Sequence, residues 1–190
     1  IGLLGYYIAS LMDFLGLQYV TAGIERLVLY VYPTLVLLIS AWLFKRSIRR
    51  IEVLALLFTY VGVGVAFIDK NALSGSDNFW LGVFFVFIAA IAFALYIVGS
   101  GEYVKQLGTR RFTVWTMSIA CTAIFIHHSV ANQLQLFHFQ TPVYLYAFLM
   151  SVIGTVLPSF MIAEGIRRIG ASNAAIIGSI GPISTIILEI

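Results

Sequence analysis

The chain has 190 residues, of which 61% are hydrophobic and only 10% are charged, and its mean hydropathy is +1.01. Soluble domains carry roughly a quarter of charged residues, so this composition excludes a soluble globular domain and indicates an integral membrane protein. The net charge of +3 does not indicate a nucleic-acid partner, because in a membrane protein the positions of the cations matter more than their sum.

Seven apolar runs, each of about 17 to 20 residues, follow one another along the chain. They predict transmembrane helices at about 2–18, 26–44, 51–68, 79–98, 112–130, 144–163 and 172–190. The most polar stretch, 69–78, lies between the third and fourth helices and is interpreted as a linker between two halves. The predicted fold is therefore all-α and integral to the membrane. Because the chain begins and ends inside apolar runs, we expect it to be a fragment.

The two halves repeat. An offset of 149 residues brings Pro33 onto Pro182, Gly16 onto Gly165 and Ala22 onto Ala171, and the first two predicted helices then coincide with the last two. Residues 1–68 are accordingly interpreted as the last three helices of one repeat, and 79–190 as the first four of the next. With five helices in each repeat, the intact protein is expected to have ten.

The cations predict the orientation of the helices. Nine of the eleven Lys and Arg residues lie in alternate loops, which the positive-inside rule places in the cytoplasm. The nine are Lys45, Arg46, Arg49, Arg50, Lys105, Arg110, Arg111, Arg167 and Arg168, whereas Arg26 and Lys70 lie on the other side. Because five is an odd number, the two repeats have opposite orientations in the membrane.

One pattern occurs twice, in LGLQYVTAGIERLVLYVYPTL and in EGIRRIGASNAAIIGSIGPIS. A short turn leads to a helix start rich in small residues, followed by a proline within the helix and a long apolar tail. This pattern resembles the EamA-type drug/metabolite transporter superfamily over essentially the whole chain. The resemblance implies a ten-helix carrier of two inverted repeats in a bacterial plasma membrane, which moves small metabolites by alternating access.

The sequence contains no GxxxxGK[ST] phosphate-binding loop, so an ion or solute gradient is the expected energy source. No cofactor and no metal site are expected, and the single cysteine, Cys121, excludes a disulfide within the chain. The expected partners are a small-molecule substrate and the lipid bilayer.

Asp13 is the most informative single residue, because a carboxylate inside a membrane helix costs about 2.5–3.5 kcal/mol at full depth. Glu25 and Arg26 begin the next helix on the same outer side of the membrane. We predict that Asp13, with Glu25 or Arg26 as its neighbour, forms a protonatable or substrate-binding site. The alternative interpretation is that all three are polar residues at wet helix ends that reach water and lipid headgroups.

Tyr30 and Tyr32 lie deeper, beside Pro33, and are weaker candidates for lining a substrate cavity. Pro33, Pro158 and Pro182 are expected to kink their helices, because proline releases a backbone carbonyl one turn earlier. Either these kinks expose backbone to a cavity or they serve packing alone.

Two other classes of function are possible from the residues present. A serine hydrolase would pair Ser100 with His127 or His128, but the topology places Ser100 on the cytoplasmic side and the histidines on the outer side, about 30 Å away. No catalytic residue is therefore predicted. A membrane scaffold or receptor that transports nothing remains the alternative; it predicts a closed inter-helix cavity and a fixed partner for Asp13.

Overall fold

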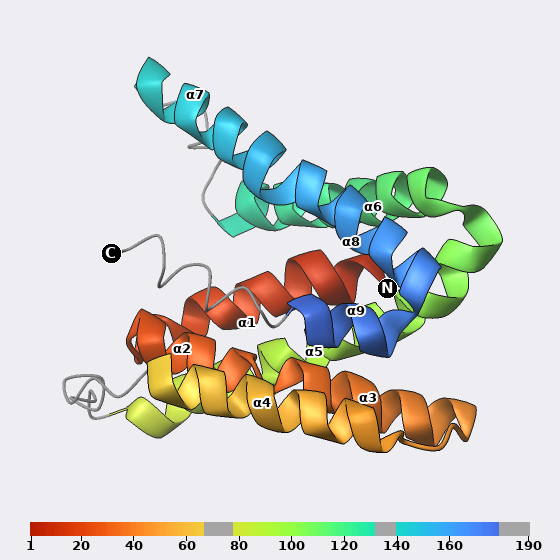
Figure 1. Ribbon diagram of the computed structural model, residues 1–190. Coiled ribbons are helices and arrows are strands. Elements are labelled where there is room, and N and C mark those ends of the chain that lie inside the picture. Colours follow the sequence, from red (N-terminus) through yellow and green to blue (C-terminus); the bar gives the residue numbers. More distant parts are fainter. Residues whose placement is uncertain (67–77, 132–139, 179–190) are drawn as a thin grey trace.

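The computed structural model describes residues 1–66, 78–131 and 140–178, and every element in these ranges is helical (Figure 1). The elements in chain order are η1 (Leu3–Ile8), α1 (Ala9–Gly16), α2 (Ala22–Leu29), α3 (Tyr32–Phe44), α4 (Arg50–Ala66), α5 (Phe79–Leu107), α6 (Thr109–Ala131), α7 (Thr141–Met150), η4 (Ser151–Val156), α8 (Leu157–Ile169) and α9 (Ala171–Gly178). The two η elements are π-helical and continue directly into α-helices.

As far as the structure describes them, the predicted apolar runs are largely helical. Four of the helices in the described ranges are long and apolar enough to cross a membrane: Ala22–Phe44, Phe79–Leu107, Thr109–Ala131 and Thr141–Ile169. The helix Leu3–Gly16 is apolar but shorter, and α4 has 17 residues. The all-helical membrane fold is thus confirmed, whereas seven spans and a ten-helix protein stay predictions. Most of the predicted linker 69–78 lies outside the described residues.

Two helices, α5 and α8, are longer than the apolar runs predicted. α5 continues to Leu107 instead of ending near 98, and α8 continues to Ile169 instead of ending near 163. In α5 the extra turns contain Glu102 and Lys105, which form an i,i+3 ion pair with a 3.5 Å N···O distance. Such pairs stabilise an exposed helix, so the helix persists beyond the hydrocarbon, where hydropathy gives no signal.

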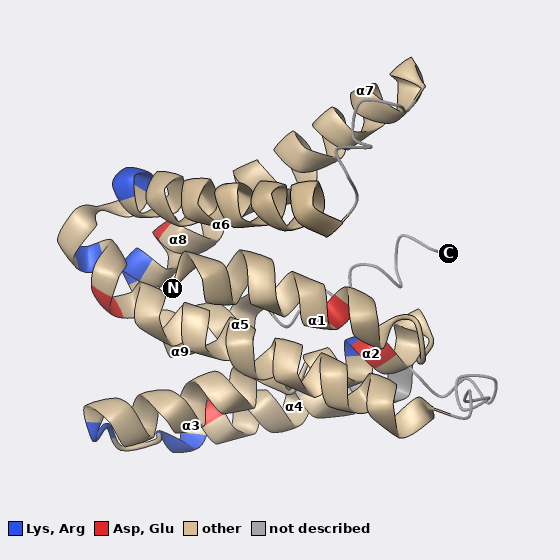
Figure 2. Cartoon of the chain, turned by 180° about the vertical axis from the view of Figure 1, so that it is seen from behind, with Lys and Arg blue, Asp and Glu red and all other residues tan. Residues whose placement is uncertain are grey.

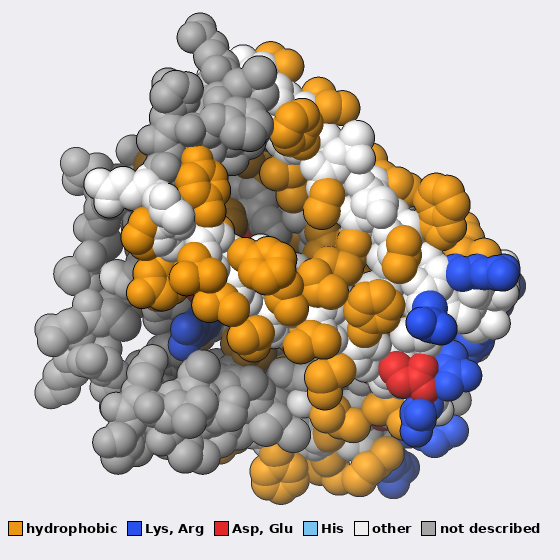
Figure 3. Space-filling model, turned by 90° about the horizontal axis from the view of Figure 1, so that it is seen from above, with side chains coloured by type: hydrophobic (Ala, Val, Ile, Leu, Met, Phe, Trp, Pro, Cys, Tyr) orange, Lys and Arg blue, Asp and Glu red, His pale blue; other side chains and the backbone are white. Residues whose placement is uncertain are grey.

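α5 lies at the centre of the arrangement and contacts α1, α2 and α3 from the first half as well as α6, α8 and α9 from the second. Its small residues make this possible: Ala89, Ala90 and Ala94 are fully buried between neighbouring helices. Large apolar side chains instead cover much of the outer surface (Figure 3), and Trp42 and Trp80 are each 79% exposed. Such a surface is stable against lipid and not against water.

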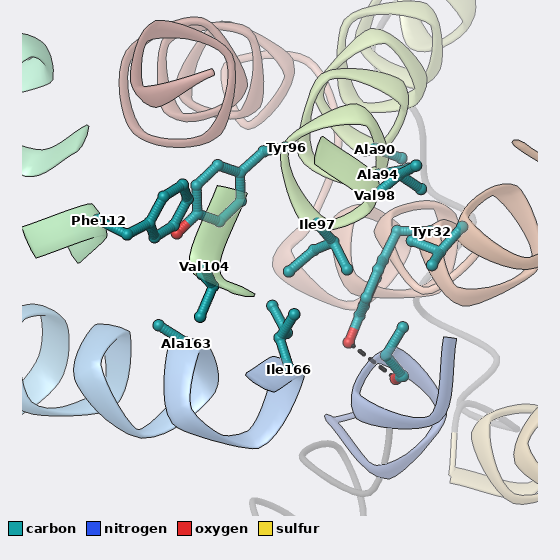
Figure 4. Packing of buried hydrophobic residues seen from close by; sticks show 12 residues of the cluster. Tyr32, Ala90, Ala94, Tyr96, Ile97, Val98, Val104, Phe112, Ala163 and Ile166 are labelled. Carbon is teal, nitrogen blue, oxygen red and sulfur yellow. Dashed lines mark hydrogen bonds between the residues drawn. The ribbon is translucent and has the colours of Figure 1, made fainter. Parts of the chain in front are cut away.

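The main core lies where α5 meets α6 and α8 (Figure 4). Phe112 stacks on Tyr96, with ring centroids 6.3 Å apart, and Val104 and Ile166 are fully buried beside them. On the other side of α5, the Tyr32 side chain extends to α9, where its hydroxyl donates to the backbone carbonyl of Ala175 at 3.2 Å. This bond joins the two halves of the chain.

The charges gather at the two ends of the helices (Figure 2). The cations that follow α3 and α5 and those at the end of α8 lie at one end, and the charged residues of α1 and α2 lie at the other. This separation agrees with the predicted clustering of cations in alternate loops, whereas the side of the membrane on which they lie stays a prediction.

Three local features recur at the 149-residue offset. α2 begins at Ala22 and α9 at Ala171, and the π-helical η1 and η4 lie within one residue of equivalence. The offset also places Gly5 on Gly154. α1 and α8 end at opposite ends of the molecule (Figure 2), as inverted repeats require. These features support the repeat, although the superposition of the two halves stays a prediction.

Two prolines lie at helix boundaries. α2 ends at Leu29 and α3 begins at Tyr32, directly before Pro33, because a proline cannot donate the hydrogen bond that would continue the helix. Pro158 stands in the first turn of α8, after the π-helical segment η4. Pro182 lies outside the described residues.

Candidate functional site

A pocket of about 370 Å³ lies where α1, the α2–α3 junction and α5 meet. Its wall is apolar and aromatic apart from a few hydroxyl groups and one carboxyl group. The lining residues are Gly5, Tyr6, Ala9, Ser10, Asp13, Leu29, Tyr30, Tyr32, Ala89 and Phe93. Three of the residues singled out in the sequence, Asp13, Tyr30 and Tyr32, thus share one pocket.

Asp13, which lines this pocket, and Glu25, which does not, form a pair of carboxyl groups. Asp13 stands one turn before the end of α1, and Glu25 stands in the first turn of α2. Their side chains lie within hydrogen-bonding reach of one another. Two carboxylates this close repel, whereas one proton shared between them converts the repulsion into a hydrogen bond.

The connection between the helices sets this geometry. The segment 17–21 turns the chain back, and the Thr21 side chain caps α2 by accepting from the backbone N–H of Ile24 at 3.5 Å. Glu25 is only 7% exposed. Oδ1 of Asp13 is also buried, and no N–H or hydroxyl group of the described residues donates to it. Asp13 therefore keeps an unused acceptor beside the pocket.

Arg26 is not placed to form a simple ion pair with Asp13. Among the described residues it forms no salt bridge with either carboxylate. Its charge nevertheless acts on Glu25 and on the Tyr30 hydroxyl, so it lies near the pair without lining the pocket. Of the two neighbours that the sequence offers for Asp13, the structure brings Glu25 into contact.

The aromatic wall contains residues that sequence reasoning did not select. The Tyr6 and Tyr96 hydroxyls share a hydrogen bond of 2.9 Å, and Phe93 packs edge-on against Tyr32 with ring centroids 5.1 Å apart. Tyr6 and Ser10 precede Asp13 by seven and three residues, a spacing that puts all three on one face of a helix. That periodicity is the signal that could have identified them.

The residues considered for a hydrolase contact other groups. The Ser100 hydroxyl is fully buried and donates to the backbone carbonyl of Tyr96 at 2.6 Å. Nδ1 of His127 is hydrogen-bonded to the Tyr7 hydroxyl at 3.0 Å. Ser100 and His127 thus form hydrogen bonds with other groups and not with each other.

Comparison with known proteins identifies relatives of this chain. The model of the EamA-like transporter family matches residues 80–190. The uncharacterized transporter YcbK of Bacillus subtilis is 31% identical over 97% of this chain and 60% of its own length. The uncharacterized transporter YyaM of the same organism is 24% identical over 100% of this chain and 63% of its own length.

A solved crystal structure of a protein aligns with 94% of this chain and 56% of its own length, at 18% sequence identity and a TM-score of 0.58. At this identity the likeness shows the fold alone. The chain spans about 60% of the length of the curated relatives that it matches. With more than half of its residues matched by the family model, the chain belongs to the EamA-like transporter family.

Proposed function

We propose that the intact protein to which this chain belongs is a secondary transporter that moves a small metabolite by alternating access, driven by a gradient. Membership of the EamA-like transporter family and the names of the two relatives support transport. The observation that carries the proposal is the carboxyl group of Asp13, which lines a 370 Å³ pocket among apolar helices.

In this proposal the pocket holds the solute or the coupling proton. An ionisable group inside a membrane domain is costly and is retained where it faces a cavity or a partner. Asp13 does both, because it lines the pocket and contacts Glu25. Aromatic rings beside a carboxylate also suit a positively charged or proton-carrying solute with an apolar body.

Proton coupling follows from the chemistry of the pair. A proton placed between the Asp13 and Glu25 carboxyl groups would convert their repulsion into a hydrogen bond. A solute that binds to Asp13, or a rearrangement that separates α1 from α2, would release that proton. Tyr32 lines the pocket with its ring while its hydroxyl holds α9, so pocket occupancy and the contact between the halves are physically linked.

The scaffold interpretation predicts a closed cavity and a fixed cationic partner for Asp13. An open pocket of this size, and a contact that is a second acid instead of a cation, favour a carrier over a scaffold. A scaffold has no need for a buried Glu25 beside a partly buried Asp13, because two adjacent acids would lower its stability.

The test is an uptake screen in proteoliposomes that contain the intact protein, with and without a pH gradient. We expect at least one small metabolite to accumulate, and accumulation to depend on the gradient. The variant Asp13→Asn should abolish this dependence, and Asp13→Glu, which keeps a carboxyl group, should retain part of it. Gradient-dependent uptake by Asp13→Asn at the wild-type rate would show that the pocket has another role.

A further inference from the structure

A second pocket, of about 260 Å³, lies between the two halves of the chain. It is at the cation-rich end of the helices, opposite the charged residues of α1 and α2 (Figure 2). The end of α3 forms one side, the last turns of α5 form another, and the start of α9 closes the third. The lining residues are Ser40, Phe44, Arg46, Val98, Gly101, Glu102, Lys105, Gly170, Ala171 and Ser172.

Two serine hydroxyls in this pocket have no partner. Ser40 is 5% exposed and Ser172 is 2% exposed. The Oγ atom of each is buried and has no hydrogen-bond partner among the described residues. Both serines and Arg46 also border a narrow crevice directly beside the pocket. A buried hydroxyl without a partner is costly, so two of them in one place indicate that a ligand supplies the missing partner.

The N-terminus of α9 adds donors to the same place. The first helical hydrogen bond runs from the backbone N–H of Ala174 to the carbonyl of Gly170 at 3.1 Å. The N–H groups of the residues between them therefore have no acceptor within the helix. In the equivalent helix of the first half, Thr21 caps the start of α2 with its side chain, but Gly170 has no side chain that could cap α9.

The charged groups at the opening of the pocket suit a ligand that is rich in hydrogen-bond acceptors. Arg46 forms an ion pair with Glu52, and Lys105 forms one with Glu102 at 3.5 Å. The Arg46 and Lys105 side chains are 38% and 58% exposed, and each carries more N–H donors than one carboxylate can accept. Among the described residues that line the pocket, Glu102 is the single acid, so charged donors outnumber charged acceptors.

We propose that this pocket binds the oxyanion group, a carboxylate or a phosphate, of a small solute that enters from the cytoplasmic side. The Ser40 and Ser172 hydroxyls and the amide groups at the start of α9 donate to the anion, while Arg46 and Lys105 attract it. The site joins α3 of the first half to α9 of the second, so its ligand bridges the two halves near the cytoplasmic surface.

The test uses the purified intact protein in nanodiscs of phosphatidylcholine, titrated calorimetrically with inorganic phosphate and with acetate at constant ionic strength. We expect saturable binding of at least one of the two anions. Ser172→Ala and Lys105→Gln should each weaken binding roughly tenfold, because each removes a donor to a charged ligand. Ser172→Thr, which keeps the hydroxyl, should bind like the wild type.

Two control variants remove the same kinds of group, a hydroxyl and a cation, at positions outside the pocket. Ser118→Ala removes an exposed hydroxyl on α6, and Arg110→Gln removes an exposed cation from the same end of the molecule as Lys105. Both should leave the affinity unchanged. Absence of saturable binding by the wild type, or equal weakening in Ser172→Ala and Ser118→Ala, would overturn the proposal.

A repeat of the titration in nanodiscs with phosphatidylglycerol separates a solute from a lipid headgroup. Phosphate affinity should stay the same if the ligand comes from solution. Loss of phosphate binding in the anionic lipid, with binding retained in phosphatidylcholine, would mean that a lipid headgroup occupies the pocket, and the assignment to a soluble anion would be wrong.

Discussion

Asp13 at the end of α1 meets Glu25 at the start of α2 through their carboxyl groups, across the turn that connects the two helices. A contact between two acids is stable only with a shared proton or with a cation between them. Among the described residues no cation forms a salt bridge with either acid. The pair is therefore the proton-binding site that we propose.

Infrared difference spectroscopy should detect this proton. Between acidic and alkaline buffer, the intact protein is expected to lose the C=O stretching band of a protonated carboxyl group. Asp13→Asn and Glu25→Gln should each remove that band, since the proton belongs to the pair. If Asp13→Asn leaves the band unchanged, the proton lies on another acid and the pair is not its site.

The orientation of the chain predicts which loops a membrane-impermeant thiol reagent can reach. In an intact protein whose Cys121 has been replaced by alanine, Asn78→Cys should be labelled from outside intact cells and Ser47→Cys should be labelled only after lysis. Ser47 lies among the cations between α3 and α4, and Asn78 lies just before α5. Labelling of Ser47→Cys alone in intact cells would invert the topology.

Tyr32→Phe tests the hydrogen bond between the halves. The substitution keeps the ring but leaves the carbonyl of Ala175 without the Tyr32 hydroxyl, which donates at 3.2 Å. We expect a loss of about 1 kcal/mol in the free energy of unfolding, seen as a lower thermal midpoint in detergent. Tyr146→Phe on α7, where the side chain is 65% exposed, is the control. Equal midpoints for the two variants would show that the bond does not stabilise the protein.

The repeat makes a prediction about two glycines. A side chain on Gly16 would collide with Val86 and approach the backbone oxygen of Gly82 at 3.1 Å, whereas Gly165 has open space around it in the described residues. If the second repeat packs like the first, the helix equivalent to α5 covers Gly165 in the intact protein. Gly16→Val and Gly165→Val should then each cost about 1–3 kcal/mol. An intact protein that tolerates Gly165→Val without a change in thermal midpoint would argue against the symmetric packing.

The sequence predicts the helical membrane fold well, because hydropathy reports directly on which segments suit lipid. It also selects Asp13 and Glu25 as candidates, since Asp13 is an acid inside an apolar run and Glu25 stands at the start of the next helix. The sequence alone does not decide whether Glu25 or Arg26 is the neighbour of Asp13. These two residues differ by about 100° around the helix axis, and only the path of the turn at 17–21 decides which of them meets α1.

The rest of the pocket depends on contacts between distant parts of the chain. Ala89 and Phe93 of α5 complete the wall, although more than 70 residues separate them from Asp13. The sequence does not reveal the pocket proposed to bind an anion for the same reason, because Ser40 and Ser172 are ordinary small residues in their own helices. Only the packing of α3 against α9 leaves both hydroxyls buried together without partners.

Proton movement coupled to solute transport tests the central claim most directly. Proteoliposomes that contain the intact protein and an internal pH indicator would receive a solute identified in the uptake screen, with no pH gradient imposed. For the wild type we predict a change in internal pH when the solute enters, and for Asp13→Asn we predict none. Solute entry into wild-type vesicles without any proton movement, or an unchanged proton signal in Asp13→Asn, would contradict a transport site built on the Asp13–Glu25 pair.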